Sequence, residues 1–282
     1  MRILTAMDRH SYSRNVIPDV SRLAANTWAD LTLLGVQQNK SEPDPQLVET
    51  MLAYQDELLS HVNREETIYA PVSGADLKEC GKGCWQATSR GRKRLTICLR
   101  SGDALKSILA QAEEEESDLI VLGCTRGFDC EWENELGLPQ RVAKEAGCSV
   151  LVIKEQKKAN QISSFLDQTN VSQQSLELIN QLVTLHDAGL KIVGLKGQKG
   201  LIGKEDVEKK MMELLKYYNE RKISAWIKMV DMENLEDYVV SATREGIVAL
   251  WVGKKSLLSK IFSRDLVGKL VSRSQSSILI LR

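Results

Sequence analysis

The sequence lacks a net charge, a membrane-spanning apolar run and a leader segment. Its 38 lysines and arginines balance 38 aspartates and glutamates. A chain without excess positive charge has no long-range attraction to nucleic acid or to an anionic membrane surface. No apolar run approaches the roughly 20 residues that a membrane span needs, and no signal peptide opens the chain. We therefore expect neither nucleic acid as a partner nor direct insertion into a membrane.

Cysteine is also sparse, with six residues in a chain of 282. This is too few for a disulfide scaffold, and we expect free or buried thiols in a reduced, cytoplasmic setting. Cys80 and Cys84 form a CxxxC pair, and Cys124 and Cys130 flank a loop. Neither pair has a second ligand pair nearby, so the spacing predicts no zinc site.

One stretch has the pattern of a ligand-binding edge. The apolar run Leu119–Leu122 ends at Gly123, Gly127 follows in a short loop, and Gly137 precedes the helix-like stretch Pro139–Ala146. A buried parallel strand reads as a continuous apolar run, and glycine at its carboxyl end lets backbone N–H groups approach a phosphate. Open α/β sheets place their ligands at this edge. The stretch therefore predicts a candidate phosphate loop.

The rest of the first half alternates between strands and helices. We expect strands at Arg2–Met7, Leu31–Val36, Leu95–Leu99 and Val150–Ile153. Helices are expected from Val16, at 47–62 and after the capping residue Asp103, and residues 63–92 are expected to be irregular. Alternation of this kind favours a parallel, doubly wound sheet.

The second half repeats this order. The strand Ile162–Leu166 ends at Asp167 as the first strand ends at Asp8, and each aspartate lies 27 residues before a glycine, Gly35 or Gly194. A helix at 203–222 follows, then strands at Ala225–Val230, Ile247–Gly253 and Ser277–Arg282. We therefore predict two tandem Rossmann-like five-stranded units, at residues 1–155 and 161–282, joined by a linker at 156–160.

The strand that ends in aspartate and the later glycine loop together resemble the universal stress protein family, and the resemblance spans both halves. Members have five-stranded Rossmann-like units and often bind ATP or AMP. The resemblance implies that the first half contacts adenine near Asp8 and Val36 and phosphates at Gly123, Gly127 and Gly137.

The sequence departs from the family pattern in both halves. In the first, the spacer after Gly123 is one residue longer, Leu138 replaces a hydroxyl residue, and the loop carries four carboxylates that repel phosphate, Asp129, Glu131, Glu133 and Glu135. In the second, Gly253 leads into a basic stretch, and Arg264 and Asp265 stand where glycine and a hydroxyl residue are expected. Nucleotide binding is therefore not expected in the second half.

Degenerate tandem copies of this kind are also similar to the cytosolic C-terminal domain of prokaryotic cation-chloride cotransporters and related permeases. That domain contains the stress-protein fold twice and lacks a working ATP motif. This similarity implies a regulatory or dimerisation domain beside a membrane transporter.

Other motifs have simpler interpretations. The run from Gly197 to Glu205 fails as a P-loop because Glu205 replaces the magnesium-binding hydroxyl. No nucleophile and acid are arranged around the three histidines, His10, His61 and His186, so no catalytic site is predicted. Asp8 and Asp167 can equally be capping residues at strand–helix turns.

The two candidate loops differ in charge, because the second carries Lys254, Lys255, Lys260 and Arg264. In the stress-protein family the last strands of two units commonly pair. We therefore predict that Ser149–Lys154 pairs with Ser277–Arg282 within the chain and brings the loops near one another or near a partner surface.

Two functions follow from these patterns. The first is a non-catalytic regulatory or dimerisation module, belonging to a transporter, that forms a homodimer and binds no nucleotide. The alternative is a stand-alone tandem universal stress protein that holds ATP or AMP in its first half. An enzyme is not expected.

Overall fold

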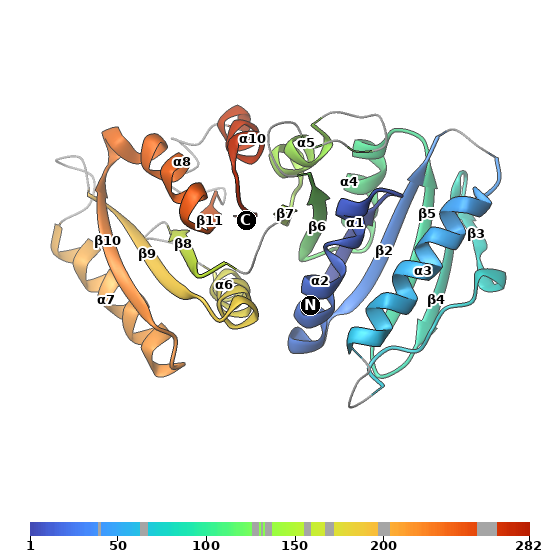
Figure 1. Ribbon diagram of the computed structural model, residues 1–282, viewed down its shortest axis with the longest axis horizontal. Helices are drawn as coiled ribbons and strands as arrows, with labels where there is room; N and C mark the ends of the chain where they lie inside the picture. Colours follow the sequence, from blue (N-terminus) through green and yellow to red (C-terminus); the bar gives the residue numbers. More distant parts are fainter. Residues whose placement is uncertain are drawn as a thin grey trace. The chain divides into compact units, whose positions relative to one another are not determined.

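A computed structural model describes residues 1–38, 41–62, 67–125, 130, 132, 137–154, 159–166, 172–196, 204–252 and 264–282. The chain forms two compact units, Met1–Glu155 and Gln156–Arg282. Each unit has a mostly parallel α/β sheet, as Figure 1 shows, which confirms the predicted fold class.

In the first unit the strand order is β7-β6-β1-β2-β5-β4-β3. The five parallel strands of this order are β7 (Ser149–Lys154), β6 (Leu119–Cys124), β1 (Arg2–Met7), β2 (Asp30–Gln37) and β5 (Arg94–Ser101). Every residue of β6 and β7 is buried, as expected for parallel strands covered on both faces. All five were predicted from their apolar runs.

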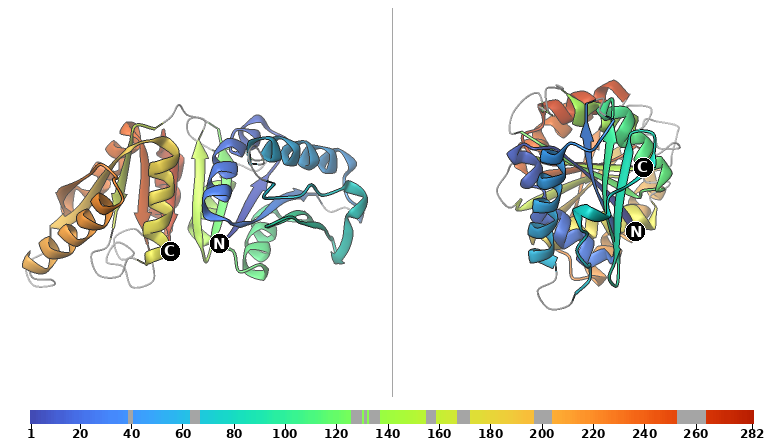
Figure 2. Two further views of the ribbon diagram at one scale, coloured as in Figure 1. Left: turned by 90° about the horizontal axis from the view of Figure 1, so that it is seen from below. Right: turned by 90° about the vertical axis from the view of Figure 1, so that its right-hand side faces the viewer.

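Helices cover both faces of this sheet. They are α1 (Ser11–Arg14), α2 (Ile17–Thr27), α3 (Pro45–Val62), α4 (Ala104–Glu114) and α5 (Leu138–Glu145), with a short 3₁₀ helix, η1, at Gly74–Asp76. Helix α2 packs against α3, and α4 packs against α5. Right-handed crossovers place these pairs on opposite faces, and Figure 2 shows α3 and α4 on either side of the strands. The predicted cap of α4 is confirmed, because the Asp103 carboxylate accepts from Lys106 N–H at 2.8 Å.

The segment expected to be irregular contains an antiparallel hairpin instead, so that prediction was wrong for residues 78–90. Strands β3 (Lys78–Gly81) and β4 (Cys84–Arg90) form the hairpin, and β4 pairs with β5 from Cys84–Arg100 to Arg90–Arg94. Trp85 and Ala87 are buried, whereas Gln86 between them and Thr88 after them are not. This alternation is the period of a half-buried strand.

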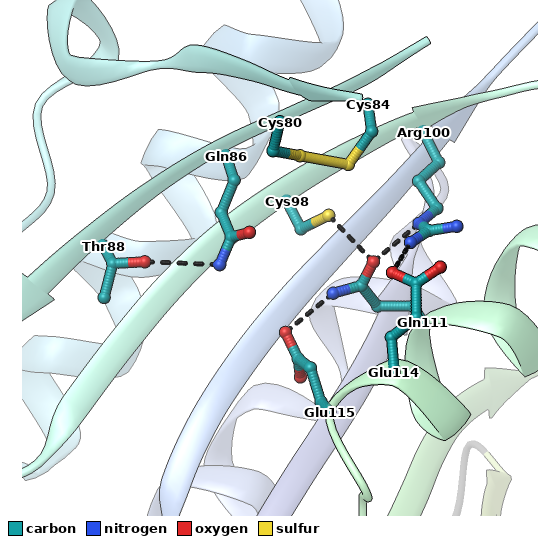
Figure 3. Close-up of a disulfide and its surroundings, with 9 residues drawn as sticks. All are labelled: Cys80, Cys84, Gln86, Thr88, Cys98, Arg100, Gln111, Glu114 and Glu115. Atoms are coloured by element: carbon teal, nitrogen blue, oxygen red, sulfur yellow. Dashed lines mark hydrogen bonds and ion pairs between the residues drawn. A yellow bond between two sulfur atoms is a disulfide. The ribbon is translucent and has the colours of Figure 1, made fainter. Parts of the chain in front are cut away.

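Two disulfides correct the expectation of free thiols. Cys80–Cys84 joins β3 to β4, and Cys124–Cys130 joins the end of β6 to the loop that follows, with Cα–Cα distances of 5.5 and 4.9 Å. Figure 3 shows the first of these. Cys98 and Cys148 belong to neither disulfide. Disulfides are uncommon in the reducing cytoplasm, where those that occur are usually transient, catalytic or redox-sensing.

In the second unit the order is β10-β9-β8-β11-β12, and all neighbours are parallel. The strands are β8 (Gln161–Phe165), β9 (Gly189–Lys196), β10 (Ala225–Asp231), β11 (Ile247–Trp251) and β12 (Ile278–Leu281). The helices are α6 (Gln173–His186), α7 (Lys204–Glu220), α8 (Leu235–Glu245) and α10 (Arg264–Arg273), with a 3₁₀ helix, η2, at Met232–Asn234. The sequence did not predict α8 or α10.

The two units share one topology. Replacing β1, β2, β5, β6 and β7 by β8, β9, β10, β11 and β12 reproduces the strand order. The register agrees as well, because Arg2 pairs with Asp30 and Gln161 pairs with Gly189, each 28 residues apart. The hairpin β3–β4 has no counterpart in the described part of the second unit, where β10 is the edge strand of the sheet.

No helix in the described part of the chain is long and apolar enough to span a membrane. The predicted pairing of Ser149–Lys154 with Ser277–Arg282 stays a prediction.

Candidate functional site

The candidate site lies at the carboxyl edge of the first sheet, between β1 and β6. Met7 pairs with Gly35, and Ala6 pairs with Leu122. The next residues along these strands are Asp8, Val36 and Gly123, so the structure brings three predicted site residues to one edge. Strand β1 lies between β2, which follows it in the chain, and β6, which comes much later. The strand order therefore reverses at β1, and its carboxyl end is the topological switch point of the sheet.

Asp8 is buried, with 1% of its surface exposed. One carboxylate oxygen accepts from the backbone N–H of His10 at 3.0 Å and the hydroxyl of Ser13 at 2.7 Å, and the other accepts from the hydroxyl of Tyr12. The Asp8 carbonyl accepts from the Tyr54 hydroxyl at 2.9 Å. Asp8 therefore holds the turn into α1, as a capping carboxylate does.

Ser11 and Ser13 precede the apolar face of the first long helix, where serine is a common N-cap, but neither of them caps a helix. His10 is the N-cap of α1, and its side chain makes no capping hydrogen bond. The Ser13 hydroxyl instead donates to the Asp8 carboxylate and accepts from the Asp8 backbone N–H. In the second unit Ser172 does cap α6, accepting from Ser175 N–H at 3.1 Å.

Gly123 is required by packing. A Cβ added there lies 2.4 Å from the backbone oxygen of Tyr12, because α1 lies directly on the end of β6. Only glycine allows two backbones to approach this closely. The glycine that opens the predicted phosphate loop therefore has a structural role within its own unit.

The loop after Gly123 is tied at the residues that the structure describes. Cys130 is bonded to Cys124, and its carbonyl accepts from Gly137 N–H at 3.0 Å. Gly137 has φ of 75° and is the N-cap of α5, so this predicted residue stands at a helix N-terminus in the left-handed region. Trp132 is 2% exposed. Gly127, Asp129, Glu131, Glu133 and Glu135 lie outside the described residues.

A buried lysine lies at the same edge. Lys154 ends β7, pairs with Cys124 in register, and is 1% exposed. Burial lowers the pKa of its ammonium to about 8. The sequence analysis did not single out this residue, although a lysine at the end of an apolar strand was a visible signal.

The second unit lacks the glycine of this site. Leu122 pairs with Ala6 in the first unit, and Leu250 pairs with Phe165 in the second. The shared register therefore places Trp251, 7% exposed, at the position of Gly123. Comparing the two halves of the sequence placed Gly253 at the position of Gly123, which is wrong by two residues.

Other predicted residues of the second unit are only partly described. Asp167, Gly253, Lys254, Lys255 and Lys260 lie outside the described residues. Arg264 begins α10, and Asp265 lies in its first turn. A carboxylate in the first turn favours the helix dipole but disfavours a phosphate at the same place.

The remaining motifs form no site in the part of the chain that the structure describes. His10 stacks on Tyr12, His61 lies in the last turn of α3 and His186 ends α6. No group of acidic, cysteine and histidine residues among those described is arranged to hold a metal ion. The rejected P-loop run lies mostly outside the described residues, and α7 begins at its Lys204.

Comparison with solved structures identifies the fold. A universal stress protein from Archaeoglobus fulgidus DSM 4304 matches 100% of this chain and 98% of its own, with a TM-score of 0.59 and 12% identity. The fold is that of the universal stress proteins. A functionally unknown protein from Pseudomonas aeruginosa PAO1 matches 99% of this chain and 92% of its own, with a TM-score of 0.56 and 15% identity.

No family profile matches the chain. No curated protein matches it either. A universal stress protein solved in complex with cAMP covers 55% of this chain with a TM-score of 0.35, which is too distant to bear on the ligand.

Replacing Gly123 with alanine should lower the free energy of unfolding by about 3 kcal/mol, because the new methyl group overlaps the Tyr12 carbonyl. Urea denaturation measures this. Gly81→Ala is the matched control, since nothing lies within 4 Å of its added Cβ, and it should change stability by less than about 1 kcal/mol. Equal stability of both variants would contradict the close approach.

Lys154 should make stability depend on pH in the alkaline range. Its folded pKa of about 8 lies below the unfolded value of 10.5, so between these values the unfolded chain binds more protons and stability rises with pH. The rise should be on the order of 3 kcal/mol. Denaturation at several pH values should show it in the native chain and not in Lys154→Met. Parallel pH profiles in the two proteins would exclude a lowered pKa.

Proposed function

We propose that the chain is a non-catalytic regulatory module with the universal stress protein fold and without a working nucleotide site. One observation carries this proposal: both oxygens of the buried Asp8 carboxylate accept hydrogen bonds from the turn that follows β1. A carboxylate satisfied in this way has little capacity left to orient an adenine ring.

The second unit supports the same proposal. Trp251 stands where a phosphate loop needs glycine, and an indole at that place keeps the backbone away from a ligand. A tandem module with neither site in working order fits the proposed cytoplasmic regulatory domain of a cation-chloride-type or related transporter.

The alternative is a stand-alone universal stress protein that binds ATP or AMP in its first half. Asp8, Val36 and Gly123 do meet at one edge, and Lys154 at that edge supplies a cation. Gly137 also begins a helix whose N-terminus can face an anion.

Calorimetry separates the two proposals. Titration of the chain with ATP and with AMP, each with and without Mg²⁺, should give no binding heat. One site per chain at micromolar affinity, weakened by Lys154→Met, would establish the alternative and overturn the proposal. Binding that this variant leaves unchanged would also overturn it and would place the nucleotide elsewhere.

We further propose that the module self-associates as a homodimer, as expected of a dimerisation module. Sedimentation velocity should show a dimer whose fraction rises with concentration. Reversing the charges of Lys254 and Lys255 to glutamate should lower that fraction or the stability of the chain, because these lysines lie in the basic loop. Lys269→Glu, at an exposed position of α10, is the control and should change neither. A monomer at every concentration would contradict the self-association.

A further inference from the structure

Strand β4 carries different side chains on its two faces. Trp85 and Ala87 are 6% and 3% exposed and face the core. The alternate residues, Gln86, Thr88 and Arg90, face the other way. Thr88 pairs with Thr96, so polar side chains of β4 and β5 share one face.

This face forms one wall of a cavity of about 820 Å³. Every residue that lines the cavity is polar or charged, and all belong to the first unit: Arg2, Gln86, Thr88, Arg90, Arg94, Thr96, Gln111, Glu114 and Glu115. Cavities that hold small molecules usually measure 300–1,000 Å³. The space is therefore large enough for a molecule the size of a sugar phosphate.

The cavity is separate from the edge that carries Asp8. Arg2 and Arg94 are the first residues of β1 and β5, so the cavity opens at the amino edge of the sheet. Asp8 follows the last residue of β1. The six residues of that strand separate the two places by about 20 Å.

The α4 side of the cavity is held in place by hydrogen bonds. The Glu115 carboxylate accepts from Gln111 at 2.7 Å and from the Thr32 hydroxyl at 2.8 Å. The Gln111 carbonyl oxygen accepts from Arg100 Nε at 2.6 Å, and Arg100 also pairs with Glu114. Figure 3 shows this network, apart from Thr32, beside Gln86 and Thr88. Each carboxylate of this wall therefore already has a partner within the protein.

Two of the three guanidinium groups that line the cavity also have partners in the protein, and the third has none among the described residues. Arg2 donates to the Glu115 carbonyl and to Glu116, and Arg94 pairs with Asp30 at 3.3 Å. Arg90 is exposed and makes no hydrogen bond or ion pair with the described part of the chain. The hydroxyls of Thr88 and Thr96 also line the cavity and lie 3.1 Å apart. A positive charge and neutral polar groups thus remain available to a ligand.

We propose that this cavity binds a small organic oxyanion, a molecule with a phosphate or carboxylate group and further polar groups. Arg90 receives the anion, because a guanidinium donates two parallel hydrogen bonds to such a group. Thr88, Thr96 and Gln86 bond the rest of the molecule. This site goes beyond the proposed function and does not depend on it.

Calorimetry at low salt with ribose 5-phosphate, inorganic phosphate and malonate tests the proposal. At least one probe should bind once per chain with millimolar or tighter affinity. Arg90→Ala should weaken that binding at least tenfold, because it removes the charge-assisted hydrogen bonds to the anion. Thr88→Tyr should abolish it by filling the cavity from an exposed position. Binding of the phosphates or of malonate alone would tell which anion is preferred.

Lys82→Ala is the matched control, because it removes an exposed positive charge from the same hairpin outside the cavity. It should leave binding unchanged, and the unfolding temperature of each variant checks that it folds. The proposal is overturned if no probe binds saturably or if Lys82→Ala weakens binding as much as Arg90→Ala. It is also overturned if Lys154→Met weakens binding and Arg90→Ala does not, because the probe then lies at the carboxyl edge.

Discussion

The close approach between the Tyr12 backbone and Gly123 determines the carboxyl edge of the first unit. It seats α1 on β6, and α1 in turn supplies the hydroxyl groups and the N–H that satisfy Asp8. Neighbouring Cys124 then ties the following loop through its disulfide. A side chain at position 123 would separate these parts, because protein backbones do not compress.

Much of the fold was predictable because its signals are local. Apolar runs such as Leu119–Leu122 mark parallel strands buried on both faces. Asp103 and Ser172 mark helix starts, where their side chains bond backbone N–H groups. The equal spacing of aspartate and glycine in the two halves agrees with the equal register of the first two strands of each unit. Asp8, Val36 and Gly123 meet at one edge because parallel strands end together.

What could not be predicted depends on geometry across the sheet. The disulfides require two Cβ atoms to face each other, which spacing alone does not specify. Alignment on Gly253 concealed Trp251, because only strand pairing fixes which residue lies opposite Phe165. The alternation of Trp85 and Ala87 with polar residues is a strand signal in the sequence, but it lies in a mostly polar segment and was overlooked. Arg90 joins the cavity because β4 pairs with β5.

The two units share a topology but differ in chemistry. The first contains the hairpin, the polar cavity and all six cysteines of the chain, and the second contains no thiol. A reducing agent therefore changes covalent bonds in one repeat only. The second unit has the same topology but no cysteine, so it serves as a control for the effect of reduction on the first unit. Any response of the second repeat to reduction would report how strongly the two are coupled.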